Sequence, residues 1–233
     1  MAKANATNTI SKKTLPKKVL LAFPLGALII ALVLFLPAGS LNYWQGWLFL
    51  GSLFIPLIFI LLYFLKNDPE FLQRRMQYKE KETQQKKIVG VTTLLLFLGF
   101  IVPGLDYRFG WSSVHFFLVL FADLMVFLSY MFIFFVFKEN SYCARTVRVE
   151  KGQKIVTTGP YSFVRHPMYL GIIVMYLFIP LALGSYYALI FFVPTVIGII
   201  FRTLDEERVL LKELKGYKNY KKKVKYRIFP RLW

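Results

Sequence analysis

Long uncharged apolar segments dominate this sequence and limit what it can fold into. Charged residues make up only 18% of the 233 and gather in a few clusters, so six apolar runs remain, at about residues 19–38, 44–65, 88–105, 112–137, 168–183 and 186–201. A helix of about 20 apolar residues spans a bilayer. The apolar share is 57%, against roughly 45–50% in a soluble domain. The sequence therefore excludes a soluble globule and predicts an all-α, polytopic transmembrane bundle of about six apolar helices.

The last two runs are about 16 residues each, and only Gly184 and Ser185 separate them. Residues of these two types favour turns, so the two runs are expected to form a tight helical hairpin. A span needs roughly 17 residues or more. Two alternatives follow, a hairpin that crosses the bilayer completely and one that enters and leaves on the same side.

The basic residues predict the orientation of the bundle. Of the 30 Lys and Arg, which outnumber the 12 Asp and Glu, five precede the first run, seven lie between the second and third, six between the fourth and fifth, and eleven after the sixth. The three remaining turns together hold only Arg108. Because basic residues concentrate in cytoplasmic loops, both termini of this multi-pass membrane protein are expected in the cytoplasm. Topology and anionic headgroups account for the charge, so no nucleic-acid partner is expected.

The chain is expected to divide at about residue 138. Residues 1–137 hold an N-terminal cytoplasmic tail and the first four runs, and residues 138–233 hold the polar motifs, the hairpin and a basic tail. Residues 66–87 are expected to form a solvated interfacial helix. The single Cys143 excludes a disulfide framework within the chain. Two distant histidines do not make a metal site, and no Gly-rich nucleotide loop occurs.

The loop before the fifth run carries the first informative motif. Gly159 and Pro160 predict a turn, and Pro167 suits the first position of a helix. A helix start directs free N–H groups and the positive end of the helix dipole outward, where an anionic group can bind. Arg165 and His166 stand at this start. The alternative is that both residues only mark the headgroup boundary.

The second motif lies where the sixth run leaves the membrane, and it contains Arg202 followed by Asp205, Glu206 and Glu207. If the helix continues to Gly216, Arg202 and Glu206 share one face. The alternative role is a simple intrahelical salt bridge. Because the hairpin returns the chain to Pro167, the two motifs are expected to meet in one pocket at the membrane interface.

Two further features involve partners within or beside the bilayer. The tail after Lys215 interleaves cations with aromatic residues, which suits binding to anionic lipids. Asp123 lies within the fourth run, and intramembrane carboxylates are often functional. The alternative for Asp123 is a neutral carboxyl hydrogen-bonded to a Ser, Thr or Tyr of a neighbouring helix.

Together the two motifs resemble those of the isoprenylcysteine carboxyl methyltransferase family, integral-membrane enzymes that are similar to phospholipid N-methyltransferases. The resemblance covers roughly the C-terminal 95 residues and rests on Gly159-Pro160-Tyr161, Arg165-His166-Pro167-Met168-Tyr169, Arg202 with Glu206-Glu207, Gly216-Tyr217, Tyr220 and Ile228-Phe229-Pro230. It implies a pocket for S-adenosyl-L-methionine between the two motifs. The implied cofactor-binding residues are Gln153, Lys154, Ile155, Val156, Gly159, Tyr161, His166, Pro167, Met168, Tyr169 and Glu206.

The same resemblance implies carboxyl methylation of an isoprenylcysteine-type, lipid-like acceptor that enters from the bilayer. Arg202 and Glu207 are the expected catalytic residues, with Arg202 facing the acceptor carboxylate. The spacing from Glu206 and Glu207 to Gly216 differs by about one residue from the spacing in the family. Either of these two glutamates could therefore be the cofactor ligand. One alternative is a phospholipid N-methyltransferase, in which Glu207 or Asp205 accepts the proton of an amine. Others are a non-catalytic membrane protein and a nicotinamide-dependent membrane reductase.

Overall fold

The computed structural model describes residues 15–76, 83–143, 146, 149–150 and 152–233, and this part of the chain is helical. Six long helices correspond to the six apolar runs, so the predicted all-α bundle is confirmed. The helices are α1 (Leu15–Ala38), α2 (Trp44–Asn67), α3 (Pro69–Arg75), α4 (Thr83–Phe109), α5 (Phe116–Glu139), α6 (Pro167–Ala182), α7 (Leu189–Glu213) and α8 (Tyr217–Lys223), with a 3₁₀ turn, η1, at Gly159–Ser162.

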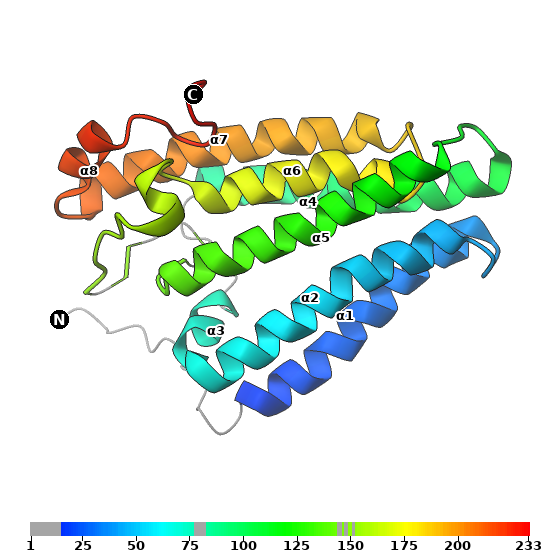
Figure 1. Ribbon diagram of the computed structural model, residues 1–233, viewed down its shortest axis with the longest axis horizontal. Helices are drawn as coiled ribbons and strands as arrows, with labels where there is room; N and C mark the ends of the chain where they lie inside the picture. Colours follow the sequence, from blue (N-terminus) through cyan, green and yellow to red (C-terminus); the bar gives the residue numbers. More distant parts are fainter. Residues whose placement is uncertain (1–14, 77–82, 144–145, 147–148, 151) are drawn as a thin grey trace.

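The long helices run side by side along the longest axis of the molecule, and the short helices lie toward one end of it, α3 beside α2 and α8 beside α7 (Figure 1). Helix α5 packs on α2 and α6, α4 packs on α1 and α7, and α6 packs on α7. The loop that precedes α6 and the charged second half of α7 lie at the same end as α3 and α8 (Figure 1). This arrangement gathers the predicted functional residues at one end of the bundle.

Length and apolarity identify Trp44–Asn67, Gln85–Phe109 and Phe116–Glu139 as membrane-spanning candidates, and Ala22–Ala38 and Pro167–Ala182 as shorter apolar helices. Large apolar side chains on all of these helices are exposed on the surface of the bundle. Such a surface is stable against lipid and not against water. The protein is therefore an integral, multi-pass membrane protein.

The predicted hairpin of the last two runs is confirmed, with α6 ending at Ala182 and α7 beginning at Leu189. Gly184 takes a positive φ of 74° in the turn, a conformation that favours glycine. Asp106, at the end of α4, is buried and accepts hydrogen bonds from the hydroxyls of Ser112 and Ser185. This carboxylate holds the turn of the hairpin against α4.

Asp123 within α5 and the segment 66–87 between two apolar runs both contact neighbouring helices. The hydroxyl of Ser52 on α2 is hydrogen-bonded to Oδ1 of Asp123 at 2.8 Å, the contact with a neighbouring helix that the alternative for Asp123 predicted. The prediction of one solvated interfacial helix over residues 66–87 is wrong, because α3 ends at Arg75 and α4 already begins at Thr83. Gln85 is fully buried and its Nε2 donates to Oδ2 of Asp205 on α7 at 2.5 Å. Residues 77–82 lie outside the described part of the chain.

Candidate active site

The start of α6 is built by a turn, a cap and a proline. In η1, Gly159 has a φ of 54°, which lets the chain reverse before Tyr161. His166 is the N-cap of α6 and Pro167 its first residue, as the sequence predicted. The fixed φ of proline suits the first helical turn, where its missing N–H costs nothing. The positive end of α6 therefore faces the residues of this end of the bundle.

The C-terminal tail fixes this helix start in place. The backbone N–H of Arg165 donates to the carbonyl of Tyr226 at 3.0 Å, and that of His166 to the carbonyl of Arg227 at 2.8 Å. Through Nη1, Arg165 also donates at 2.7 Å to two more tail carbonyls, those of Val224 and Lys225. Arg165 is only 5% exposed, so the alternative that it marks the headgroup boundary is wrong.

Tyr169, in the first turn of α6, connects Arg202 and Glu206 of α7. Its hydroxyl donates to Oε2 of Glu206 at 2.5 Å and accepts from Nε of Arg202 at 3.1 Å. Arg202 is buried and Glu206 is half-buried. A cation and an anion are therefore held side by side, as the four-residue spacing predicted, with a tyrosine of the neighbouring helix between them.

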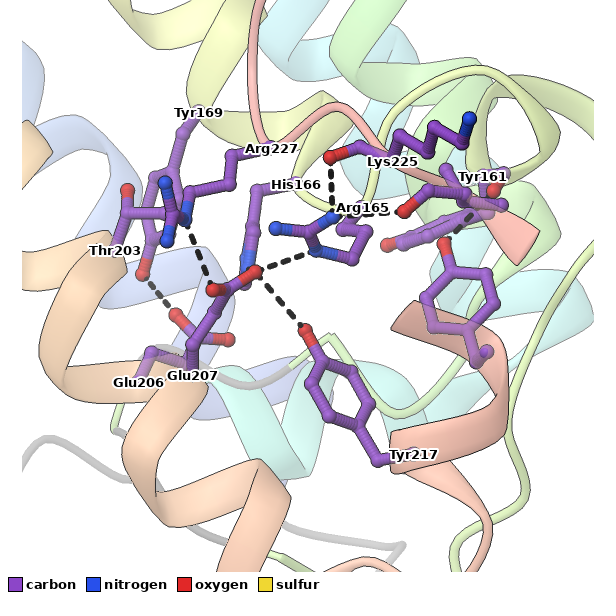
Figure 2. A network of polar contacts seen from close by, with 12 residues as sticks. Tyr161, Arg165, His166, Tyr169, Thr203, Glu206, Glu207, Tyr217, Lys225 and Arg227 are labelled. Atoms are coloured by element: carbon purple, nitrogen blue, oxygen red, sulfur yellow. Dashed lines mark hydrogen bonds and ion pairs between the residues drawn. The ribbon is translucent and has the colours of Figure 1, made fainter. Parts of the chain in front are cut away.

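Glu207 lies at the centre of a separate buried network (Figure 2). Its Oε1 accepts from Nε of Arg165 at 2.5 Å, and its Oε2 accepts from Nε of Arg227 at 3.0 Å. Nε2 of His166 is 3.5 Å from Oε1, and the hydroxyl of Tyr217 is at the same distance. These contacts join α6, α7, α8 and the tail at one carboxylate.

The surroundings of Glu207 keep it ionised. Burial by itself raises the pKa of the Glu207 carboxyl, but His166, Arg165 and Arg227 outweigh it and hold this pKa well below its usual range. Burial and the nearby charge of Glu207 raise the pKa of Tyr217, which therefore stays a hydrogen-bond donor. A carboxylate held this way is a weak base, because it must give up two arginine contacts to accept a proton.

A cavity of about 90 Å³ lies between these networks and the loop that follows α5. Most of the predicted site residues line it, namely Gln153, Lys154, Ile155, Val156, Tyr161, His166, Pro167, Met168, Tyr169, Arg202 and Glu206. Gly159 and Glu207 are not in its wall. Gly159 lies in the turn, where an added Cβ would come within 3.1 Å of the Glu139 side chain, and Glu207 lies in the network behind the wall.

Sequence reasoning missed nine residues of the wall as site residues, which are Asn140, Tyr142, Cys143, Thr146, Arg165, Leu210, Leu214, Tyr217 and Tyr220. Arg165, Tyr217 and Tyr220 belonged to the motifs of the resemblance but were not assigned to the site. Leu210 and Leu214 carried a further signal, because they continue the face of Arg202 and Glu206 in steps of four. The residues that follow α5 carried none. They reach the cavity only because α5 packs on α6.

Two buried polar atoms of the cavity-lining residues have no hydrogen-bond partner in the described part of the protein. They are Nε2 of His166 and Oγ1 of Thr146, and both residues are 6% exposed. Nε2 of His166 already faces Oε1 of Glu207 at 3.5 Å. Buried polar atoms are normally paired, so Oγ1 of Thr146 is the atom suited to a polar group bound in the cavity. The cavity as it stands is smaller than the roughly 300 Å³ that commonly holds a drug-sized ligand.

The model of the Isoprenylcysteine carboxyl methyltransferase (ICMT) family matches residues 119–212. The match runs from the first turn of α5 almost to the end of α7, and it includes the motifs at Pro167 and at Arg202. It stops before Gly216, so it does not extend to the tail that was part of the sequence resemblance. No curated protein matches the chain.

Proposed function

We propose that this chain, which matches the model of the isoprenylcysteine carboxyl methyltransferase family over residues 119–212, transfers a methyl group from S-adenosyl-L-methionine to a carboxylate on a lipid-like acceptor. The family match supports a membrane methyltransferase. The identity of the cofactor and the identity of the methyl acceptor are our proposal. The observation that carries them is the Arg202–Tyr169–Glu206 arrangement in the wall of one cavity at the start of α6.

The residues of the cavity fit the chemistry of the cofactor. A half-buried carboxylate such as Glu206 suits an ammonium or ribose hydroxyls, and the start of α6 with His166 suits a carboxylate. When bound, the cofactor supplies an activated methyl group on a sulfonium. The cavity must widen to hold a molecule of this size, because it encloses only about 90 Å³.

Glu206, not Glu207, is the proposed cofactor ligand of the acidic pair. Glu206 lines the cavity, whereas both carboxylate oxygens of Glu207 are used by Arg165 and Arg227. Glu207 therefore acts as a positioning residue. It holds the start of α6 against α7, and it keeps His166 and Tyr217 beside the cavity.

The geometry favours a carboxylate acceptor over an amine. An ionised carboxylate needs no base, and methyl transfer to it requires mainly alignment and exclusion of water. Arg202 can hold a carboxylate at two points, which a lysine cannot. An amine must first lose a proton. The two candidate proton acceptors already bind other side chains, Glu207 two arginines and Asp205 the amide of Gln85.

The acceptor is proposed to reach the cavity from the bilayer, since α7 carries exposed apolar side chains up to Phe201, next to Arg202 of the site. The distribution of basic residues supports a cytoplasmic location for this end of the bundle and for both termini. In the tail, Tyr217, Tyr220, Val224 and Ile228 are buried, so part of it belongs to the protein core. Its exposed cations are proposed to bind anionic lipid, and they are Lys218, Lys222, Lys223, Lys225 and Arg231.

The proposal is tested with purified protein, methyl-labelled cofactor and two acceptors, a prenylated thiol acid and an aminophospholipid. We expect label in a base-labile ester of the acid and none in the phospholipid. Calorimetric titration with S-adenosylhomocysteine tests the cofactor independently. Absence of binding heat at millimolar ligand would rule out the cofactor, and a base-stable methylamine product would rule out the carboxylate acceptor.

A further inference from the structure

A second cavity, of about 390 Å³, lies between α2 and α5 and away from the proposed active site. Its wall includes Trp47, Ser52 and Ile55 of α2 and Asp123, Leu124 and Phe127 of α5. Several of its apolar residues, among them Ile55 and Leu124, are exposed on the surface of the bundle. The cavity is therefore a groove that opens toward lipid. Its only ionisable lining residue is Asp123.

Asp123 is nearly fully buried at 4% exposure, and its Oδ2 has no hydrogen-bond partner in the described residues. The hydroxyl of Ser52 lies 2.8 Å from Oδ1 of Asp123 and also 3.0 Å from the carbonyl of Phe49. A hydroxyl has one proton to donate. Both contacts are made when Ser52 donates to Phe49 and the carboxyl of Asp123 donates to Ser52.

In that arrangement Asp123 is neutral and its Oδ2 is a carbonyl oxygen, which accepts hydrogen bonds. If Asp123 were ionised, Oδ2 would accept as well. Either way the groove offers a buried acceptor without a donor, among apolar walls. Buried acceptors without partners are uncommon and destabilising, so a bound hydroxyl is the group this position suits.

The groove lies near the end of the bundle that is opposite the proposed active site. Trp44, Trp47 and Trp111 are exposed at that end of the bundle, and tryptophans concentrate at the headgroup level. Ser52 is five residues further along α2 than Trp47, about 7–8 Å at the rise of a helix. A hydroxyl bound at Asp123 would therefore lie just inside the hydrocarbon, and a chain attached to it would run deeper along Ile55 and Phe127.

We propose that this groove is a binding site for an uncharged lipid alcohol, whose hydroxyl donates to Oδ2 of Asp123 while its hydrocarbon part lies between α2 and α5. A phosphate headgroup is excluded because it carries charge and offers no donor to the carboxyl. A helix from a second copy of the chain is also excluded as the occupant, because it is too large for a groove of about 390 Å³. The site is independent of the proposed methyl transfer.

The test compares two photoactivatable probes on the purified full chain in lipid nanodiscs. One is a diazirine-bearing hexadecanol, and the other is its O-methyl ether, which has the same chain and no donor. Cross-linked peptides are mapped by mass spectrometry. We expect the alcohol to label residues 47–55 and 120–127 roughly 2- to 12-fold more than the ether does, the range that one hydrogen bond gives. Unlabelled hexadecanol should displace the probe.

Two variants complete the design. Asp123→Leu should reduce labelling by the alcohol to that of the ether, whereas Asp123→Asn keeps an acceptor of the same size and should retain the preference. Equal labelling by both probes in the wild-type protein would overturn the proposal, and so would an unchanged preference in Asp123→Leu. Cross-links between two copies through this groove would overturn it in favour of a dimer contact. The comparison of probes stands on the wild-type protein even if Asp123→Leu does not fold.

Discussion

Nε of Arg165 lies 2.5 Å from Oε1 of Glu207, although 42 residues separate them and both side chains are almost fully buried. This pair ties the start of α6 to the end of α7. It also separates the roles of two adjacent glutamates, because it holds Glu207 behind the wall of the cavity and leaves Glu206 in it.

Breaking this pair should destabilise the protein. Arg165→Met leaves Glu207 buried with one partner fewer, and we expect the free energy of unfolding to fall by about 3 kcal/mol. Thermal unfolding of the detergent-solubilised protein measures the loss. Arg208→Met is the matched control, since Arg208 is exposed on the same helix and should change little. Equal stability of the two variants would contradict the structural role of Arg165.

The two glutamates should respond differently to the same isosteric change. Glu206→Gln is expected to weaken binding of S-adenosylhomocysteine roughly tenfold or more, as the loss of a hydrogen bond to a charged group does, with little change in stability. Glu207→Gln should instead lower the unfolding temperature, because Arg165 and Arg227 lose their carboxylate. Calorimetry and thermal unfolding of both variants separate the roles. A reversed pattern would show that Glu207 is the cofactor ligand.

Arg202 should affect turnover more than cofactor binding. In Arg202→Lys the charge remains but the planar, two-point contact to a carboxylate is lost. We expect kcat with a prenylated acid to fall roughly tenfold or more, with the affinity for S-adenosylhomocysteine retained. Tyr169→Phe removes the hydroxyl that joins Arg202 to Glu206, and should impair both properties. Full turnover in Arg202→Lys would exclude the proposed contact.

The pKa of Glu207 predicts how stability depends on pH. Its folded-state pKa is held well below the ordinary value of 4.5, so its ionised form stabilises the protein above that value. This contribution is lost as pH falls below 4.5 toward the folded-state pKa. The difference in unfolding temperature between wild type and Glu207→Gln should therefore be constant above about pH 6 and narrow at lower pH. A constant difference down to pH 3 would contradict the assignment.

The sequence predicted those parts of the fold that short-range chemistry decides. Hydropathy located the six long helices, Pro167 marked the start of α6, and Gly184 marked the turn of the hairpin. The four-residue spacing of Arg202 and Glu206 placed them on one helix face, and both lie in the wall of the cavity. Each of these features depends on residues close together in the chain, which is why the sequence alone was sufficient.

Only the tertiary structure decided which partner each polar group has. Helices that are apolar on all sides do not reveal from their sequence which neighbour they pack against. The burial of Gln85 against Asp205, the pairing of Arg165 and Arg227 with Glu207, and the cavity wall at Thr146 all follow from that packing. The sequence by itself determined the helices and the chemistry available at their ends, and long-range packing determined which of those groups bind each other and which face the cavity.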